Sequence, residues 1–162
     1  MLAGVISDTH GYFDERVAPC FEGVDVILHA GDVGSADVLG SLGLIGPVFA
    51  VLGNNDLGSG LPLSPRLLLE FEGHRIQLVH QLAHADLDAA SDVLICGHSH
   101  KPLIVWHGPT LHLNPGAAGR RGFQTLQSVA LLKLEAGRPP EAELITLGPR
   151  LPSGARRPRS SR

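Results

Sequence analysis

The stretch SDVLICGHSH, residues 91 to 100, joins a short apolar run to two histidines at alternate positions. The run is rich in Val, Ile and Leu, which predicts a strand covered on both faces over residues 92 to 96. A pair of histidines with no other polar company is most often part of a solvated loop. Its meaning therefore depends on which polar residues follow the other strands of the chain.

Four further apolar runs of the same kind predict strands at residues 2–7, 24–29, 47–52 and 75–80. Segments with helical spacing and capping signals lie at 14–23, 35–43 and 83–91. The alternation indicates an α/β sheet with crossover helices. Short strands that are typical of antiparallel pairing follow at 103–108, 110–116, 128–137 and 141–147, and residues 66–80 read as a hairpin.

Each buried run ends in residues that can bind metals. In open α/β sheets, sites form beyond the carboxyl ends of the strands, so five strand ends can converge on one place. The candidates are Asp8 and His10, Asp32, Asn54 with Asn55 and Asp56, His80, and His98 with His100.

Carboxylate, imidazole and amide oxygen together form the mixed N/O set that suits Mn²⁺, Fe or Zn²⁺, and the lack of Cys ligands argues against a structural zinc cluster. Without Asn55 and Asp56, seven candidate ligands remain, which are too many for one tetrahedral ion. They fit two ions that share a bridging carboxylate at a separation of roughly 3.5–4 Å.

The ordered blocks DTH (8–10), GD (31–32), GNND (53–56), His80 and GHSH (97–100) resemble the calcineurin-like metallophosphoesterases. The resemblance covers residues 1 to about 147, and the later NPG at 114–116 is similar to the small prokaryotic phosphodiesterases of YfcE type. It implies an α/β fold, a four-layer α/β/β/α sandwich of two mixed sheets flanked by helices. It also implies hydrolysis of phosphoesters, with diesters favoured, by a hydroxide that bridges two divalent ions.

The resemblance further assigns roles to single residues. Mn²⁺ is the first choice for both ions, with Ni²⁺, Fe²⁺, Zn²⁺ and Mg²⁺ as alternatives. Asp32, Asn54 and His80 are the expected catalytic residues. One ion is held by Asp8, His10 and His100, the other by Asn54, His80 and His98, and Asp32 bridges them.

Asn55 departs from the wider superfamily, which often has a His at this position to protonate the leaving group. An amide is no general acid near neutral pH, and such help is worth roughly 10²–10⁴-fold. Activated esters and diesters are therefore the expected substrates, unless another group such as His29 supplies the proton. Asn55 is an expected substrate-binding residue, as are Arg120 and Arg121, whose guanidinium groups suit phosphate. Asp56 and His29 are expected to orient the ligand residues by hydrogen bonds without binding a metal themselves.

The chain of 162 residues predicts one domain, residues 1–149, followed by a flexible Arg-rich tail at 150–162. Five of the 13 basic residues lie in that tail, which leaves eight basic against 16 acidic residues elsewhere. Such a body is unsuited to nucleic acid, except through the tail. Two cysteines and the lack of a signal peptide or long apolar span favour a cytoplasmic protein without membrane contact.

Two other functions stay open at the level of the sequence. The same cluster would serve a phosphomonoesterase that acts on a small metabolite, because substrate choice depends on pocket walls. The retromer subunit with this fold works as a protein-binding scaffold, although it has lost part of the ligand set that is complete here. A small phosphoester is the expected partner, and a homo-oligomer is possible.

Overall fold

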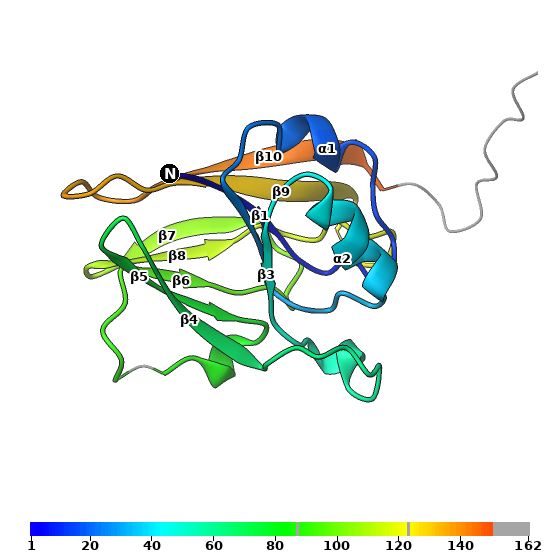
Figure 1. Cartoon of the computed structure of the whole chain (residues 1–162), viewed down its shortest axis with the longest axis horizontal. Coiled ribbons are helices and arrows are strands. Elements are labelled where there is room, and N and C mark those ends of the chain that lie inside the picture. Colours follow the sequence, from blue (N-terminus) through cyan, green and yellow to red (C-terminus); the bar gives the residue numbers. More distant parts are fainter. Residues whose placement is uncertain (87, 123, 151–162) are drawn as a thin grey trace, which may run out of the picture.

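Two five-stranded sheets pack face to face in the computed structural model, which describes residues 1–86, 88–122 and 124–150 (Figure 1). The strand order is β10-β9-β1-β2-β3 in the first sheet and β4-β5-β6-β8-β7 in the second. The first sheet contains β1 (Leu2–Ile6), β2 (Val26–His29), β3 (Val48–Ala50), β9 (Leu126–Lys133) and β10 (Glu141–Pro149). The second contains β4 (Arg66–Phe71), β5 (His74–Val79), β6 (Val93–Ile95), β7 (Leu103–His107) and β8 (Thr110–Asn114).

Both sheets are mixed, as the resemblance implied. Strands β1, β2 and β3 run parallel to one another, and so do β5, β6 and β8. The antiparallel pairing expected after residue 101 is confirmed for β7 with β8 and for β9 with β10, but β8 also pairs in parallel with β6, which the sequence did not predict. The reason is burial: four of the five β8 residues are buried while β7 is mostly exposed, so β8 takes the inner place and β7 the edge.

Two short helices cover the outer face of the first sheet, α1 (Val17–Cys20) and α2 (Ala36–Gly43) (Figure 1). The helix expected at 35–43 is confirmed, and the one expected at 14–23 shrinks to a single turn that contains Pro19. Single 3₁₀ turns follow β3 and β5, namely η1 (Asn54–Asp56) and η2 (Leu82–His84).

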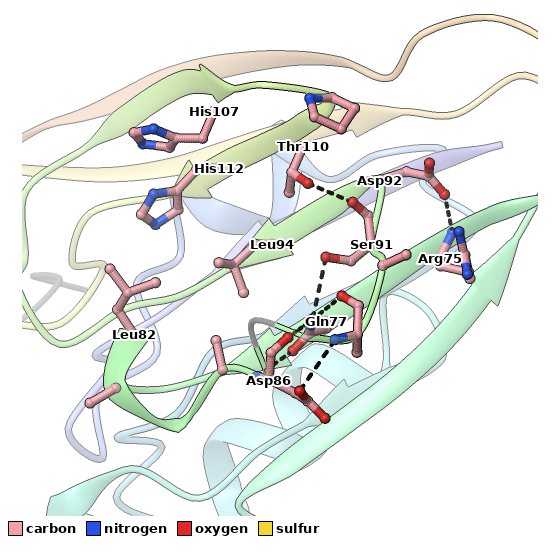
Figure 2. A pocket seen from close by; sticks show the side chains of 15 residues that line it. Arg75, Gln77, Leu82, Asp86, Ser91, Asp92, Leu94, His107, Thr110 and His112 are labelled. Carbon is pink, nitrogen blue, oxygen red and sulfur yellow. Dashed lines mark hydrogen bonds between the residues drawn. The ribbon is translucent and has the colours of Figure 1, made fainter.

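The helix expected at 83–91 is wrong, because only η2 forms there within the described residues. Side chains form hydrogen bonds with backbone N–H and C=O groups that would bond to one another in a helix. The Gln77 amide bonds to both the N–H and the C=O of Asp86 (Figure 2), and the Asp86 carboxylate accepts the N–H groups of Asp88 and Ala89. The outer layer on the second sheet is therefore one 3₁₀ turn and a loop.

The largest apolar cluster fills the space between the two sheets, and a second lies between the first sheet and its helices. This packing fixes the two sheets against each other, so the carboxyl ends of β1, β2, β3, β5 and β6 reach a common edge. No helix among the described residues is long and apolar enough to cross a membrane.

Candidate metal centre

The loops that follow five strands are tied together by backbone hydrogen bonds. Asp8 N donates to Gly31 O at 3.0 Å and His10 N to Asp32 O at 2.9 Å, which joins the loops after β1 and β2. In the second sheet, Gly97 N donates to His80 O at 3.0 Å. The two sheets meet where His98 N donates to Asp8 Oδ2 at 3.1 Å. The convergence expected from the sequence is therefore present.

The first group of metal-binding atoms consists of Asp8, His10 and His100, whose ligand atoms lie within 4.8 Å of one another. Asp8 is fully buried and its Oδ1 lies 3.0 Å from His100 Nε2. Burial lowers the pKa of His10, although Asp32 and Asp8 nearby act in the opposite direction. Its ring is therefore neutral near pH 7, and its buried Nε2 has no hydrogen-bond partner among the described residues.

A second group forms around His80, which is 1% exposed. Its Nδ1 lies 2.8 Å from Ala30 O and so carries the proton, which leaves the Nε2 lone pair for a ligand. That Nε2 lies 3.0 Å from Asn54 Oδ1 and 3.4 Å from Asp32 Oδ2. Burial would lower the pKa of His80, but Asp32, Asp8 and the Ala30 carbonyl together outweigh it and the pKa rises. A nitrogen facing two oxygens requires a cation between them, either a proton or a metal ion.

Asp32 lies between the two groups, with Oδ2 3.9 Å from His10 Nε2 and 3.4 Å from His80 Nε2. Burial would raise the pKa of Asp32. The hydrogen bonds from His80 and Asn55 more than offset that effect, and the pKa lies well below its usual range. The carboxylate is therefore charged and lies within 4 Å of a histidine nitrogen from each group.

The ligand residues share an unusual backbone conformation. Six non-glycine residues among those described have positive φ, and five of them are Asp8, His10, Asp32, His98 and His100. A positive φ costs an L-residue about 1–2 kcal/mol, and such strain gathers at functional sites. Asp8 and His10 form one tight loop of alternate left-handed residues, and His98 and His100 form another. In each loop the two side chains point in different directions.

Glycine is required where these loops approach one another. A Cβ on Gly97 would clash with Ser7 Oγ and lie 2.7 Å from Asp8 Oδ2, and one on Gly53 would clash with Asp32. Both glycines precede ligand residues, so the close packing of the loops and the placement of the ligands depend on the same positions.

The donor set fits two divalent ions. It combines two buried carboxylates, several imidazoles and the Asn54 amide oxygen, and it includes the buried His10 nitrogen that lacks a hydrogen-bond partner among the described residues. His98 belongs to the same cluster, since its ring centroid lies 5.2 Å from that of His80. All seven predicted ligands thus lie around one place.

The predicted substrate-binding residues are placed beside this cluster. The loop that carries Arg120 and Arg121 is joined to it by a hydrogen bond from Gly119 N to Asp8 O at 3.0 Å. The Arg120 guanidinium lies over the Tyr12 ring, with Cζ 3.9 Å from the centroid. Asn55 turns toward Asp32, to which its amide and its backbone N–H both donate.

Asp56 and His29 support the site without reaching into it. The buried Asp56 carboxylate accepts the N–H groups of Val33, Gly34 and Gly53, which fixes the loops after β2 and β3. His29 is fully buried and bonds to Thr9 Oγ1 at 2.9 Å. Both residues have the supporting position expected from the sequence.

Sequence reasoning missed three supporting groups. Ser7 Oγ donates to Asp8 Oδ2 at 2.6 Å, and Asn114 Nδ2 donates to Gly97 O at 2.8 Å. Arg150, which the sequence assigned to the tail, donates to the carbonyls of Gly119, Arg121 and Gln124. The NPG motif signalled Asn114, but a lone Ser or Arg gives no such signal. The rest of the predicted tail, 151–162, lies outside the described residues.

Residues 1–137 match the model of the calcineurin-like phosphoesterase superfamily domain. A curated "probable metallophosphoesterase" from Methanothermobacter thermautotrophicus is 37% identical over an alignment of 163 positions that covers 91% of this chain and 94% of that protein.

Solved structures share the fold. An archaeal phosphodiesterase superposes with a TM-score of 0.74 at 21% identity, over 90% of this chain and 99% of that one. YfcE, a phosphoesterase from E. coli, superposes with a TM-score of 0.65 at 25% identity, over 82% and 88% of the two chains. Both of these relatives are similar over most of their own length.

Proposed function

The chain belongs to the calcineurin-like phosphoesterase superfamily, in its small prokaryotic YfcE-like branch, and from that premise we propose that it hydrolyses small phosphodiesters at a centre of two divalent metal ions. One observation carries the proposal. The Asp32 carboxylate stands between the Nε2 atoms of His10 and His80, at 3.9 and 3.4 Å, so one charged group serves two neighbouring ligand sets.

Seven residues would bind the two metal ions. Asp8, His10 and His100 would hold one ion, Asn54, His80 and His98 the other, and Asp32 would bridge them. Two bound divalent ions lower the pKa of water and neutralise the charge on phosphoryl oxygens. Ala30 O fixes the ring of His80, and Ser7 fixes Asp8, so little rearrangement is needed on binding.

Three side chains would meet the substrate. Arg120 and Arg121 would face the phosphate, where a guanidinium offers two parallel donors. Asn55 would contact the ester while its amide holds Asp32. Because Asn55 has no acidic proton to give at neutral pH, esters with good leaving groups and diesters would react faster than simple alkyl monoesters.

The test is a substrate and metal panel on the purified chain. The chelated protein would be loaded in turn with Mn²⁺, Ni²⁺, Fe²⁺, Zn²⁺ and Mg²⁺, its metal content measured, and its rate compared on bis-p-nitrophenyl phosphate and p-nitrophenyl phosphate. We expect two ions per chain, the highest rate with Mn²⁺, and faster turnover of the diester.

Asp32→Asn is the decisive variant, and Arg157→Ala in the tail its control. Asp32→Asn should lose at least about 10³-fold in rate and one or both ions while the chain stays folded, because it removes the bridging charge. A higher rate on the monoester would favour a phosphomonoesterase. A metal-loaded protein with no turnover of any phosphoester would favour a protein-binding scaffold and overturn the proposal.

A further inference from the structure

Tyr12 and Arg120 form a stacked pair next to the proposed metal centre. The Cζ atom of Arg120 lies 3.9 Å from the centroid of the Tyr12 ring, so the guanidinium rests on the face of the ring. Tyr12 follows the proposed ligand His10 by two residues, yet it belongs to none of the motifs that indicated the site. Its contact with a predicted substrate-binding residue indicates a role that the motifs did not.

Both partners of the pair project from backbone that is fixed to the ligand loops. On one side, Tyr12 N donates a hydrogen bond to Thr9 O at 3.0 Å. On the other side, Gly119 N donates to Asp8 O at 3.0 Å, directly before Arg120 in the chain. A Cβ on Gly119 would clash with the carbonyl oxygens of Asp8 and Thr9, so the two backbones are in contact there. The ring and the guanidinium are therefore held beside the ligands from two segments far apart in sequence.

The stack fixes the Arg120 guanidinium without occupying its hydrogen-bond donors. The buried Nε atom lacks a hydrogen-bond partner, and no guanidinium nitrogen of Arg120 forms a hydrogen bond or ion pair with any residue that the structure describes. A carboxylate partner would use two parallel donors and cancel the charge. An aromatic ring contacts only the flat face of a guanidinium, so the N–H groups in its plane stay available to a ligand.

The acidic side chains nearby are already used. Asp14, on the same loop as the ring, forms an ion pair with Arg16 at 2.7 Å and accepts a hydrogen bond from Gln127 Nε2 at 3.0 Å. The ligand loops contribute Asp8 and Asp32, which are proposed metal ligands, and two divalent ions would more than offset their charge. In the metal-loaded protein the stacked cation would therefore face an anion that comes from outside the chain.

We propose that Tyr12 is a positioning residue, which orders the Arg120 guanidinium so that its in-plane N–H groups bind the non-bridging oxygens of the substrate phosphate. The inference rests on the proposed function and names the residue that prepares the phosphate-binding cation before the substrate arrives. A side chain that is already ordered loses less conformational freedom on binding. The contribution of Tyr12 should therefore appear in substrate affinity rather than in the chemical step.

The first test is steady-state kinetics of the metal-loaded chain on bis-p-nitrophenyl phosphate. Tyr12→Leu removes the ring, and KM should rise about three- to tenfold while kcat stays within about twofold of the wild type. Tyr12→Phe keeps the ring face and should keep the wild-type KM. Trp106→Leu is the control, because it removes an aromatic side chain that is 46% exposed in β7, and it should change neither constant.

A double-mutant cycle shows whether Tyr12 acts through Arg120. Arg120→Gln should raise KM at least as much as Tyr12→Leu, and Tyr12→Leu should cause no further rise when Arg120→Gln is already present. Equal effects of Tyr12→Leu in the two backgrounds would overturn the inference, because the ring would then act without the guanidinium. A Tyr12→Phe variant as impaired as Tyr12→Leu would also overturn it, since the hydroxyl rather than the ring would be the active group.

Inorganic phosphate gives a readout that does not depend on turnover. Its affinity for the metal-loaded chain, measured by calorimetry at equal metal content, should fall about three- to tenfold in Tyr12→Leu and stay unchanged in Tyr12→Phe. Tyr12→Met replaces Tyr12→Leu if the latter fails to fold in a thermal melt. A chain that binds phosphate in this way but hydrolyses no ester would support the inference and overturn the proposed function. Equal phosphate affinity in the wild type and in folded Tyr12→Leu would overturn the inference alone.

Discussion

Asn55 donates two hydrogen bonds to the carboxylate of Asp32, from its backbone N–H to Oδ1 at 2.8 Å and from its side-chain amide to Oδ2 at 2.6 Å. The residue that takes the place of a general acid in many relatives is therefore attached to the proposed bridging ligand. Its amide orients that carboxylate, and it cannot protonate a leaving group.

The rate should consequently depend steeply on the leaving group. In a series of methyl aryl phosphates of graded phenol pKa, log kcat should fall as the phenol becomes a poorer leaving group. Asn55→His should flatten the slope and speed the poorest ester by at least about tenfold, since a positioned acid is worth up to 10²–10⁴-fold. Asn55→Gln, which keeps an amide, should retain the steep slope; a flat wild-type slope would contradict this account.

Gly97→Ala should damage both the fold and the site. The new Cβ would meet Ser7 and Asp8, and moving either disturbs the proposed ligand Asp8, which is fully buried. We expect a loss of about 2–3 kcal/mol in unfolding free energy, in the range of an overpacked core, together with weaker metal binding. Denaturant melts and metal titration measure the two effects.

Gly40→Ala is the matched control for that variant. Gly40 lies within α2, and a Cβ there meets nothing within 4 Å. Ala is favoured over Gly in a helix by about 1 kcal/mol, so this variant should be unchanged or slightly more stable. A Gly97→Ala protein as stable as Gly40→Ala would show that the loops are looser than the structure indicates.

His29 should make the metal-free protein less stable in mild acid. Burial lowers the pKa of His29 to about 4, against about 6.5 in the unfolded chain. Between these values the unfolded chain binds more protons, so stability falls as the pH drops. His29 should contribute a loss of about 2 kcal/mol between pH 7 and pH 5.

Other groups titrate in the same window, so the comparison with His29→Gln isolates the effect. The raised pKa of His80 acts with the opposite sign, because that contribution is present at low pH and is lost as the pH rises. Urea unfolding at several pH values should show a slope smaller in His29→Gln than in the wild type. Identical slopes would mean that His29 is accessible to protons in the folded state.

Arg150→Ala should weaken substrate binding more than it weakens metal binding. Its guanidinium holds the carbonyls of Gly119, Arg121 and Gln124, and so positions the loop of Arg120 and Arg121. We expect KM to rise about tenfold, the effect of about 1.4 kcal/mol in binding, with little change in metal content. Arg138→Ala, at a residue that is 67% exposed, is the control and should leave KM unchanged.

Much of this fold follows from local pattern. The five apolar runs become β1, β2, β3, β5 and β6, since strands covered on both faces need continuous Val, Ile and Leu. The positions of the ligands after those strands follow from the same pattern.

What the sequence could not reveal depends on contacts between distant segments. The segment 83–91 has helical spacing, yet the side chain of Gln77 in β5 hydrogen-bonds to the backbone N–H and C=O of Asp86 within it. Arg150 reads as the start of a polar tail, but three carbonyls that lie far from it in sequence bind it. Positive φ at the five proposed ligands could not be predicted either, because most Asp and His residues have negative φ even though both types are enriched in the left-handed region.

The five proposed ligands with positive φ lower the stability of the fold, because each holds a strained backbone conformation, and the same residues supply the side chains for metal binding. Glycine would adopt each of these conformations without penalty, but it has no side chain with which to coordinate an ion. Replacing Asp8, His10, Asp32, His98 or His100 by glycine would therefore relieve backbone strain and remove a proposed ligand at the same position. Each of these side chains is held in a conformation that only its proposed metal chemistry requires.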